Sequence, residues 1–132
     1  MKYLLDTSTC VHFFRGRYGV ENKLKEAGVE NCAISEVTLA ELVYGAEKSA
    51  DPEKNHTIIN SFDTRIPILP IVDSVLVYGK EKVRLRNQGI MISEFDLLIG
   101  CAAIEKDLIM VTDNVKHFDR IKNIKIENWV QR

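Results

Sequence analysis

The chain has 132 residues, of which 45% are hydrophobic and 28% charged, and its formal net charge is −1. This length and composition are typical of one soluble globular domain, residues 1–132, that folds without disulfides or a structural metal. The near balance of charge excludes a strongly basic nucleic-acid-binding protein, so any contact with nucleic acid has to come from local basic patches and bound metal.

The spacing of the cysteines and the residues at the start of the sequence indicate the cellular compartment in which the protein works. Cys10, Cys32 and Cys101 are widely spaced and form no C-x-x-C pair, which predicts neither a disulfide framework nor a zinc site. The apolar run near the first residue is too short for a signal peptide, since Asp6 interrupts it. No apolar run reaches the length of a membrane span. We therefore expect a cytoplasmic protein.

In the first half of the chain, short apolar runs alternate with segments whose apolar residues follow helical spacing. Asp6, Ser35 and Asp51 are of types that cap helix N-termini, and Gly28 is of the type that ends helices. The elements expected here are a strand at 2–5, a helix from residue 6 to 14, a helix at 20–27, a strand at 32–34, a helix from 35 to about 48 and a helix from 51 to about 62.

The second half continues the alternation. Pro67 and Pro70 indicate that the strand between them lies at a sheet edge or has ragged ends. The elements expected here are a strand at 66–72, a helix capped by Asp73 and ending at Gly89, a helix starting at Ser93, a strand at 108–112, a short helix and a last strand near 124–126. Such alternation is typical of the α/β class, in which helices cover both faces of a parallel sheet, and it leaves the strand order open.

Two acidic residues each follow an apolar strand. Asp6 follows YLL, and Asp113 follows IMVT. In open α/β sheets, ligands bind beyond the carboxyl ends of the strands. We therefore expect both carboxylates to face one site.

Two further acids interrupt apolar stretches of predicted helices. Glu41 lies in TLAELVYGA, and Asp96 lies in SEFDLLIG. A carboxylate among core residues is costly unless it is paired or bound to metal. Four carboxylates that converge would repel one another, and a divalent cation removes that repulsion. Acids without His or Cys ligands favour Mg²⁺ or Mn²⁺ over zinc.

Each acid also has a purely structural interpretation. Asp6 is a potential N-cap, Asp96 has the spacing of a capping box with Ser93, Asp113 begins an Asp-Asn turn pair, and Glu41 is compatible with a solvated helix face. The set is harder to explain structurally than any one member, because two acids end strands and two interrupt apolar helical stretches.

The sequence resembles the PIN-domain ribonucleases, and among them the VapC-type toxins of bacterial and archaeal toxin–antitoxin pairs. The matching segments follow the family's order over nearly the whole chain: YLLDTS at 3–8, RG at 15–16, ISEVTLAELVYGAEKS at 34–49, ILP at 68–70, FDLLIGCAA at 95–103, VTDN at 111–114, HFDRI at 117–121 and IENW at 126–129. The resemblance implies a single PIN-like domain with about five parallel strands flanked by helices.

The resemblance also assigns site residues. The family's four acids, the catalytic and metal-binding residues, fall on Asp6, Glu41, Asp96 and Asp113, with Ser8 and Thr112 in supporting positions. The fourth acid is often Asn in these toxins, so Asp113 is expected to strengthen metal binding. Gly100-Cys101-Ala102 departs from the larger or polar residues of many relatives, and we expect this to alter packing and not chemistry.

The activity implied is that of an endoribonuclease that uses Mg²⁺, with Mn²⁺ as a substitute, and cuts structured RNA such as tRNA or rRNA. Asp6, Asp96 and Asp113 would hold one or two ions, and Glu41 would be a further ligand or would orient the attacking water. The family also implies a homodimer inhibited by a cognate VapB-type antitoxin, whose C-terminal segment lies in the active-site groove.

Basic residues near these acids are candidates for RNA binding. Arg15 matches the family's RG on the helix that Asp6 opens, and Lys116 follows Asp113. The basic run at 80–86 is explained at least as well by a solvated helix face. Structural roles are expected for four other residues: His117, Tyr44, Phe118 and Trp129.

Two other functions compete with a nuclease. A phosphotransfer receiver needs a phospho-accepting Asp at the end of a central strand, and neither Asp51 nor Asp63 follows an apolar strand. The alternative that stays open is a non-catalytic PIN-like interaction domain that binds an antitoxin or another partner. The presence of all four acids argues against it.

Overall fold

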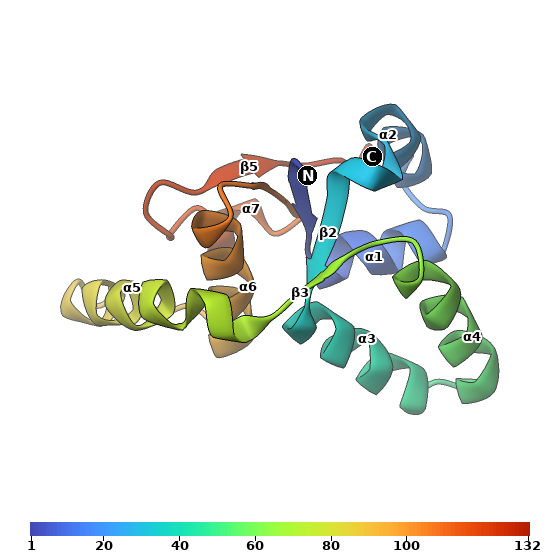
Figure 1. Cartoon of the computed structure of the whole chain (residues 1–132), viewed down its shortest axis with the longest axis horizontal. Helices are drawn as coiled ribbons and strands as arrows, with labels where there is room; N and C mark the ends of the chain where they lie inside the picture. The colour runs from blue at the N-terminus through green and yellow to red at the C-terminus, as the bar shows by residue number, and fades with distance from the viewer.

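The computed structural model describes residues 1–132, which form a parallel sheet covered by helices on both faces (Figure 1). The strands are β1 (Tyr3–Leu5), β2 (Cys32–Ser35), β3 (Ile68–Leu69), β4 (Ile109–Val111) and β5 (Lys125–Glu127). All neighbouring strands are parallel, in the order β3-β2-β1-β4-β5. The prediction of an α/β fold with about five parallel strands is confirmed.

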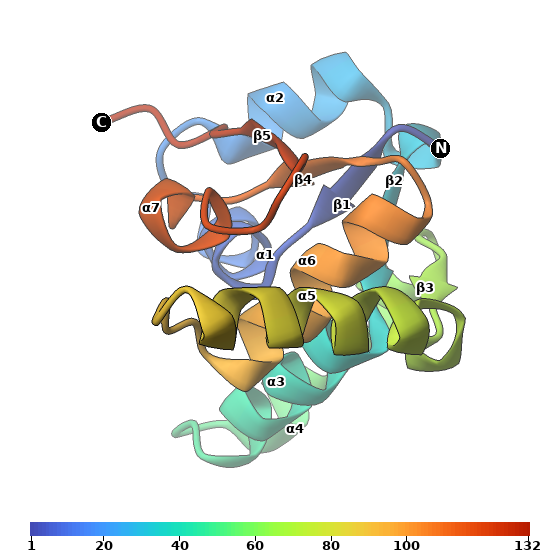
Figure 2. The same ribbon diagram turned by 90° about the vertical axis from the view of Figure 1, so that its left-hand side faces the viewer.

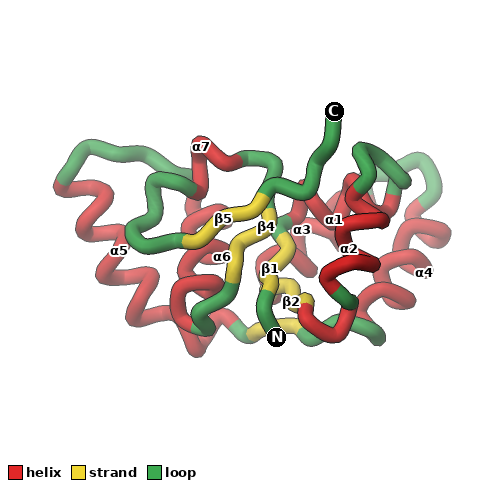
Figure 3. Tube along the Cα trace, turned by 90° about the horizontal axis from the view of Figure 1, so that it is seen from above, coloured by secondary structure: helices red, strands yellow, loops and turns green.

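The helices form the two outer layers. They are α1 (Thr7–Phe14), α2 (Val20–Ala27), α3 (Glu36–Glu47), α4 (Pro52–Asp63), α5 (Val75–Asn87), α6 (Glu94–Glu105) and α7 (Val115–Phe118). Viewed from above, α5, α6 and α7 lie to one side of the sheet, and α1, α2 and α4 lie to the other (Figure 3). Figure 2 shows α5 lying across α6, on which it packs. None of the helices is long and apolar enough to span a bilayer.

The core has two halves, one on each face of the sheet, because side chains alternate along a strand. Leu4 of β1 joins the cluster formed with α5, α6 and α7, whereas Leu5 joins the cluster formed with α1, α2 and α4. Met110 and Val111 of β4 divide in the same way. These strands are therefore buried on both faces, as their continuous apolar sequences predicted.

The strand order reverses beside β1. The chain runs outward from β1 through β2 to β3, and then returns to place β4 on the other side of β1. Leu5 and Val111 are register partners, so the residues that follow them emerge together at the carboxyl edge of the sheet. A reversal of this kind is where open α/β sheets bind ligands.

Most predicted helix starts are confirmed. Side chains of Asp6, Ser35, Asp51 and Ser93 each accept a hydrogen bond from the backbone N–H three residues later. Such caps satisfy backbone donors that have no partner within the helix. Gly28 ends α2 with a φ of +86°, a conformation that favours glycine.

Two element predictions are wrong. The strand expected at 66–72 is limited to Ile68–Leu69, because the prolines on either side have no N–H to pair with a neighbouring strand. It does lie at the sheet edge, as the prolines indicated. Asp73 does not cap α5: a 3-10 turn, Ile71–Ser74, precedes that helix, and the Asp73 carboxylate instead lies 3.0 Å from the Lys106 ammonium.

Candidate active site

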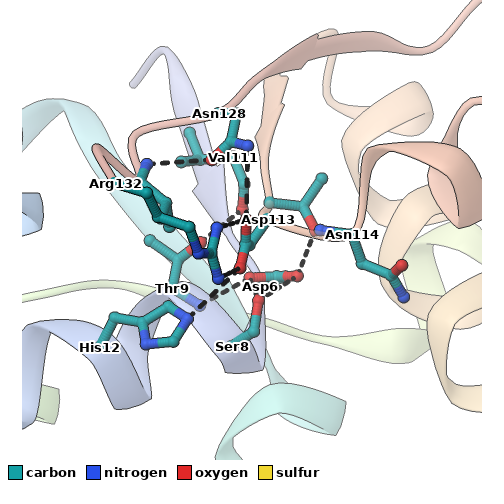
Figure 4. A network of polar contacts seen from close by, with 11 residues as sticks. Asp6, Ser8, Thr9, His12, Val111, Asp113, Asn114, Asn128 and Arg132 are labelled. Carbon is teal, nitrogen blue, oxygen red and sulfur yellow. Dashed lines mark hydrogen bonds and ion pairs between the residues drawn. The ribbon is translucent and has the colours of Figure 1, made fainter. Parts of the chain in front are cut away.

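Asp6 lies directly after β1 and serves both as helix cap and as site residue (Figure 4). Its carboxylate accepts hydrogen bonds from the Thr9 N–H at 2.8 Å, the Ser8 hydroxyl at 2.9 Å and the Thr112 hydroxyl at 2.5 Å. The Thr112 hydroxyl in turn accepts the Asn114 N–H. Ser8 and Thr112 therefore hold the Asp6 carboxylate in place, the supporting position that the resemblance implied.

The Asp6 side chain is buried, with 4% of its surface exposed. Burial raises the pKa of Asp6 above its ordinary value of 3.8, and the hydrogen bonds from Thr112, Thr9 and Ser8 lower it by less. No lysine, arginine or histidine forms an ion pair with Asp6; every donor it has is a hydroxyl or an amide. A buried carboxylate normally has a cationic partner or a bound metal, so a cation at Asp6 would relieve the cost of its charge.

Asp113, unlike Asp6, forms an ion pair with a cationic side chain. Arg132 donates to both of its oxygens, at 3.0 and 2.9 Å, and Asn128 donates at 3.4 Å. The His12 Nε2 lies 3.6 Å from the same carboxylate, and the other His12 ring nitrogen is buried without a hydrogen-bond partner. The Arg132 guanidinium is the main cause that holds the pKa of Asp113 below its ordinary value.

Asp96 lies in the first turn of α6 and also has two roles. Its N–H donates to the Ser93 hydroxyl at 3.2 Å, which is half of the predicted capping box. Its carboxylate lies 3.4 Å from the His117 Nδ1 on α7. His117 was expected to be only structural, whereas it contacts a candidate site acid. Because α7 begins two residues after Asp113, this contact ties Asp96 to the carboxyl edge of the sheet.

Glu41 lies in the middle of α3, where it is half-buried and accepts the Thr7 hydroxyl at 2.5 Å. It faces a groove with a volume of about 780 Å³. The residues that line this groove include Thr7, Arg15, Glu41, Tyr44, Lys48 and Phe95. Arg15 is therefore placed beside a candidate acid, whereas Lys116 is exposed on α7 outside this groove.

Aromatic residues near the site divide into two groups. Phe118 and Trp129 are buried, which confirms that they pack in the core. The prediction that Tyr44 packs is wrong, since 66% of it is exposed. Phe95, beside Asp96, is also largely exposed. Both exposed rings line the Glu41 groove.

The four candidate acids do not form a ready ligand cluster. Nowhere in the chain do three acidic, histidine or cysteine side chains gather closely enough to hold a metal ion. Each acid instead contacts a neighbouring side chain: Asp6 contacts Thr112, Asp113 contacts Arg132, Asp96 contacts His117, and Glu41 contacts Thr7.

The chemistry of the donors still fits a hard divalent cation. Carboxylate and hydroxyl oxygens are the ligands that Mg²⁺ and Mn²⁺ prefer, and the immediate donors around Asp6 are of this type. Asp6 is also a buried carboxylate without a cation. A metal site that includes Asp113 requires Arg132 to release the two oxygens that it engages.

Sequence reasoning missed Arg132, His12, Asn128 and Thr7 as neighbours of the acids. For Arg132 and Asn128 no local signal exists, because their position depends on β5 lying beside β4 with Val111 and Glu127 in register. Thr7 and His12 lie on the helix that Asp6 caps, and only the packing of α1 against α3 and the carboxyl edge shows what they contact.

The carboxyl edge of the sheet carries Asp6 and Asp113 and is called the acidic edge below. This edge and the fold together define the class of protein. The sequence pattern of the PIN domain matches residues 3–124, and the chain therefore belongs to the PIN domain family.

The more detailed resemblance to VapC proteins is also confirmed. The chain is 32% identical over 130 residues to the tRNA(fMet)-specific endonuclease VapC of Salmonella typhimurium, with 98% of both chains covered. It is 36% identical over 132 residues to ribonuclease VapC2 of Rickettsia felis, again with 98% of both covered. The solved structure of VapBC2 from Rickettsia felis bound to a promoter DNA fragment has a TM-score of 0.90, and covers 98% of this chain and 99% of that one. DNA-bound VapBC from Salmonella typhimurium has a TM-score of 0.91 at 31% identity, with 98% of both chains covered.

Proposed function

We propose that this chain is a Mg²⁺-dependent endoribonuclease toxin that cleaves structured RNA and is neutralised by a VapB-type antitoxin. The observation that carries the proposal is the buried Asp6 carboxylate, which has no cationic partner and lies at the strand-order reversal of a PIN domain. Membership of the VapC group supports RNA as the substrate. Among RNAs we favour tRNA over rRNA, because relatives from Salmonella typhimurium and Shigella flexneri are named tRNA(fMet)-specific endonucleases.

Asp6, Asp96 and Asp113 are the residues proposed to hold the ion, with Glu41 as a further ligand or as the base. A bound Mg²⁺ would neutralise charge on the phosphate and lower the pKa of a water molecule. Ser8 and Thr112 fix the orientation of the Asp6 carboxylate through their hydroxyls. Thr7 does the same for Glu41 and leaves its second oxygen free to accept a proton from water.

The proposed reaction is hydrolysis. The water oxygen bonds to phosphorus in line with the departing ribose oxygen, and the P–O3′ bond breaks. The proton given up by the attacking water passes to a carboxylate, and the departing O3′ takes a proton from a solvent water molecule. The products are a 5′-phosphate and a 3′-hydroxyl. A 2′,3′-cyclic phosphate would instead mean that the ribose 2′-hydroxyl attacked, which would contradict this mechanism.

Positive charge near the acids supports RNA binding. Arg15 lines the same groove as Glu41, and Lys116 is exposed on the helix that follows Asp113. We propose that both contact phosphates. Arg15→Gln should then weaken RNA binding and reduce its dependence on salt, because each phosphate contact releases counterions. Equal affinity and equal salt dependence for Arg15→Gln and wild type would remove this assignment.

We propose that the groove beside Glu41 also receives the antitoxin. Its lining is mostly apolar, and Arg15 and Lys48 add positive charge. Solved structures similar to this chain include VapBC complexes. The homodimer implied by the family resemblance is tested separately, by light scattering of the purified chain.

Cleavage assays with matched variants test the nuclease. The purified chain is incubated with total cellular RNA and with tRNA(fMet), in Mg²⁺ or in chelator, and the new RNA ends are sequenced. Asp6→Asn and Asp96→Asn remove a proposed ligand while keeping the size of the side chain. Asp119→Asn is the control, because Asp119 is exposed directly after α7 and its side chain forms no hydrogen bond or ion pair.

The expected result is discrete cleavage by wild type and Asp119→Asn in Mg²⁺, with none in chelator or by the other two variants. Cleavage that persists in chelator would contradict the metal requirement. The absence of cleavage by any form, at several Mg²⁺ and Mn²⁺ concentrations, would favour the non-catalytic interaction domain.

A further inference from the structure

The segment 128–132 follows β5 and extends beyond the carboxyl edge of the sheet, where Asn128 and Arg132 lie beside Asp113 (Figure 4). Trp129 anchors it: the indole is 4% exposed and packs edge-on against Tyr3, with ring centroids 5.2 Å apart. The Gln131 N–H then donates to the Tyr18 carbonyl at 2.8 Å. These contacts bring Arg132 to Asp113.

Residues 15–19, which connect α1 and α2, form a loop that contacts this segment. Gly16, Tyr18 and Gly19 all have left-handed backbones, with φ of 61°, 59° and 72°. A side chain is rarely found in that conformation, so Tyr18 is held there by its surroundings. Gly19 has a φ of +72°, which favours glycine, and a Cβ there would lie 2.9 Å from the Gln131 side-chain oxygen, so the loop and the segment are in close contact.

Arg132 makes two kinds of contact at the end of the segment. Its guanidinium carbon lies 4.7 Å from the centroid of the Tyr18 ring, a cation–π contact. Its two terminal nitrogens donate to the two oxygens of Asp113, at 3.0 and 2.9 Å. This fork geometry is the one in which arginine binds carboxylates best.

The consequence concerns the cation that Asp113 is proposed to bind. A guanidinium held in a fork on Asp113 occupies lone pairs that a metal would use, and its positive charge repels a second cation nearby. Asp6, at the end of the neighbouring strand, has no such competitor. The Arg132 side chain is also 59% exposed, so it can leave Asp113 for solvent without disturbing the core.

We propose that Arg132 is an internal competitor for the divalent cation: while it is bound to Asp113 the metal site has low affinity, and its release creates the high-affinity site. This inference rests on the proposed role of Asp113 as a metal ligand. Arg132 is in this view a positioning residue, whose effect is on metal affinity before any RNA is present.

The test measures Mn²⁺ binding without RNA, by the electron paramagnetic resonance signal of free Mn²⁺ and by calorimetry. Arg132→Gln should lower the dissociation constant for Mn²⁺ by roughly tenfold, the change expected if the competing state holds about nine-tenths of the molecules. Arg86→Gln removes the same charge from an exposed position on α5 and should leave the constant within about twofold of wild type.

A double-mutant cycle separates competition from a general charge effect. Asp113→Asn should weaken Mn²⁺ binding, and adding Arg132→Gln to it should change nothing further, because the group they compete over is gone. Mn²⁺ binding by wild type that Arg132→Gln leaves unchanged or weakens would overturn the role of Arg132 and leave the nuclease proposal intact. If neither wild type nor any variant bound Mn²⁺, this inference and the metal requirement would both fall.

Discussion

Replacing Thr112 by valine tests how the buried Asp6 carboxylate is stabilised. Thr112→Val keeps the shape of a fully buried side chain. It removes the hydroxyl that donates to Asp6 at 2.5 Å and accepts the Asn114 N–H at 2.9 Å. A hydrogen bond to a charged group contributes about 1.5–3 kcal/mol and a neutral one about 1 kcal/mol, so the free energy of unfolding should fall by about 2.5–4 kcal/mol at neutral pH. For 132 residues, 1 kcal/mol corresponds to about 4 °C in Tm, which predicts a decrease of about 10–16 °C.

The cost of Thr112→Val should also depend on pH. The folded-state pKa of Asp6 is already raised by burial, so ionisation of Asp6 costs stability as the pH rises through that pKa. Loss of the Thr112 hydrogen bond raises the pKa further. The difference in unfolding free energy between wild type and variant should therefore be larger at neutral pH and shrink as the pH falls toward 3.8, the ordinary value for Asp.

Urea unfolding followed by circular dichroism at several pH values measures both effects. Thr38→Val is the matched control, because Thr38 is equally buried but its hydroxyl has only a 3.4 Å contact with the Thr7 hydroxyl. This control should lose about 1 kcal/mol or less at every pH. The reasoning is refuted if the two variants lose the same amount at neutral pH, or if the loss in Thr112→Val does not grow with pH.

Three further predictions concern parts of the molecule away from Asp6. The pKa of Glu81 is lowered, mainly by hydrogen bonds from Arg84, so Glu81→Gln should reduce the free energy of unfolding in urea by about 1.5–3 kcal/mol at neutral pH. This reduction should disappear as the pH falls through the Glu81 pKa, and a reduction that persists in acid would contradict the prediction. A Cβ on Gly100 would lie 2.2 Å from the Ile121 side chain, so Gly100→Ala should lower Tm. A Cβ on Gly79 meets nothing, so Gly79→Ala should raise Tm through a gain of up to about 1 kcal/mol in helix propensity. A change of Tm in the same direction for both variants would be evidence against tight packing at Gly100. The three cysteines are buried, and burial raises their thiol pKa values, to about 12 for Cys101, so iodoacetamide should label them at neutral pH only after unfolding, with mass spectrometry as the readout.

The fold could largely be predicted because its signals are local. Caps such as Ser35 and Ser93 and the apolar runs before Asp6 and Asp113 each lie within a few residues of the element they define. The strand at 66–72 was overestimated since apolar character was weighed above the missing N–H groups of its prolines. The strand order could not be predicted, because it depends on which strands pair across more than 100 residues.

The sequence predicted which acids belong to the candidate site, but not which side chains contact those acids. Asp6 and Asp113 were placed at one edge because carboxyl ends of parallel strands meet there. That Arg132 pairs with Asp113, and His117 with Asp96, follows from the packing of segments far apart in the sequence. The exposure of Tyr44 was likewise hidden, since helical spacing identifies the apolar face of α3 but not how far its neighbours cover it.

Because β1 lies in the middle of the sheet, its pairing with β4 has to wait for a strand that is synthesised much later. Tyr3–Leu5 is synthesised before all the other strands of the sheet, and one of its two neighbours, Ile109–Val111, follows more than 100 residues later. At about 5–20 residues per second, the first strand waits several seconds or longer for that partner. Asp6 and Asp113 cannot come together before then, so a partly synthesised chain cannot assemble the acidic edge. A protein that attacks RNA would therefore spare the ribosome that is making it until β4 and Asp113 have been synthesised.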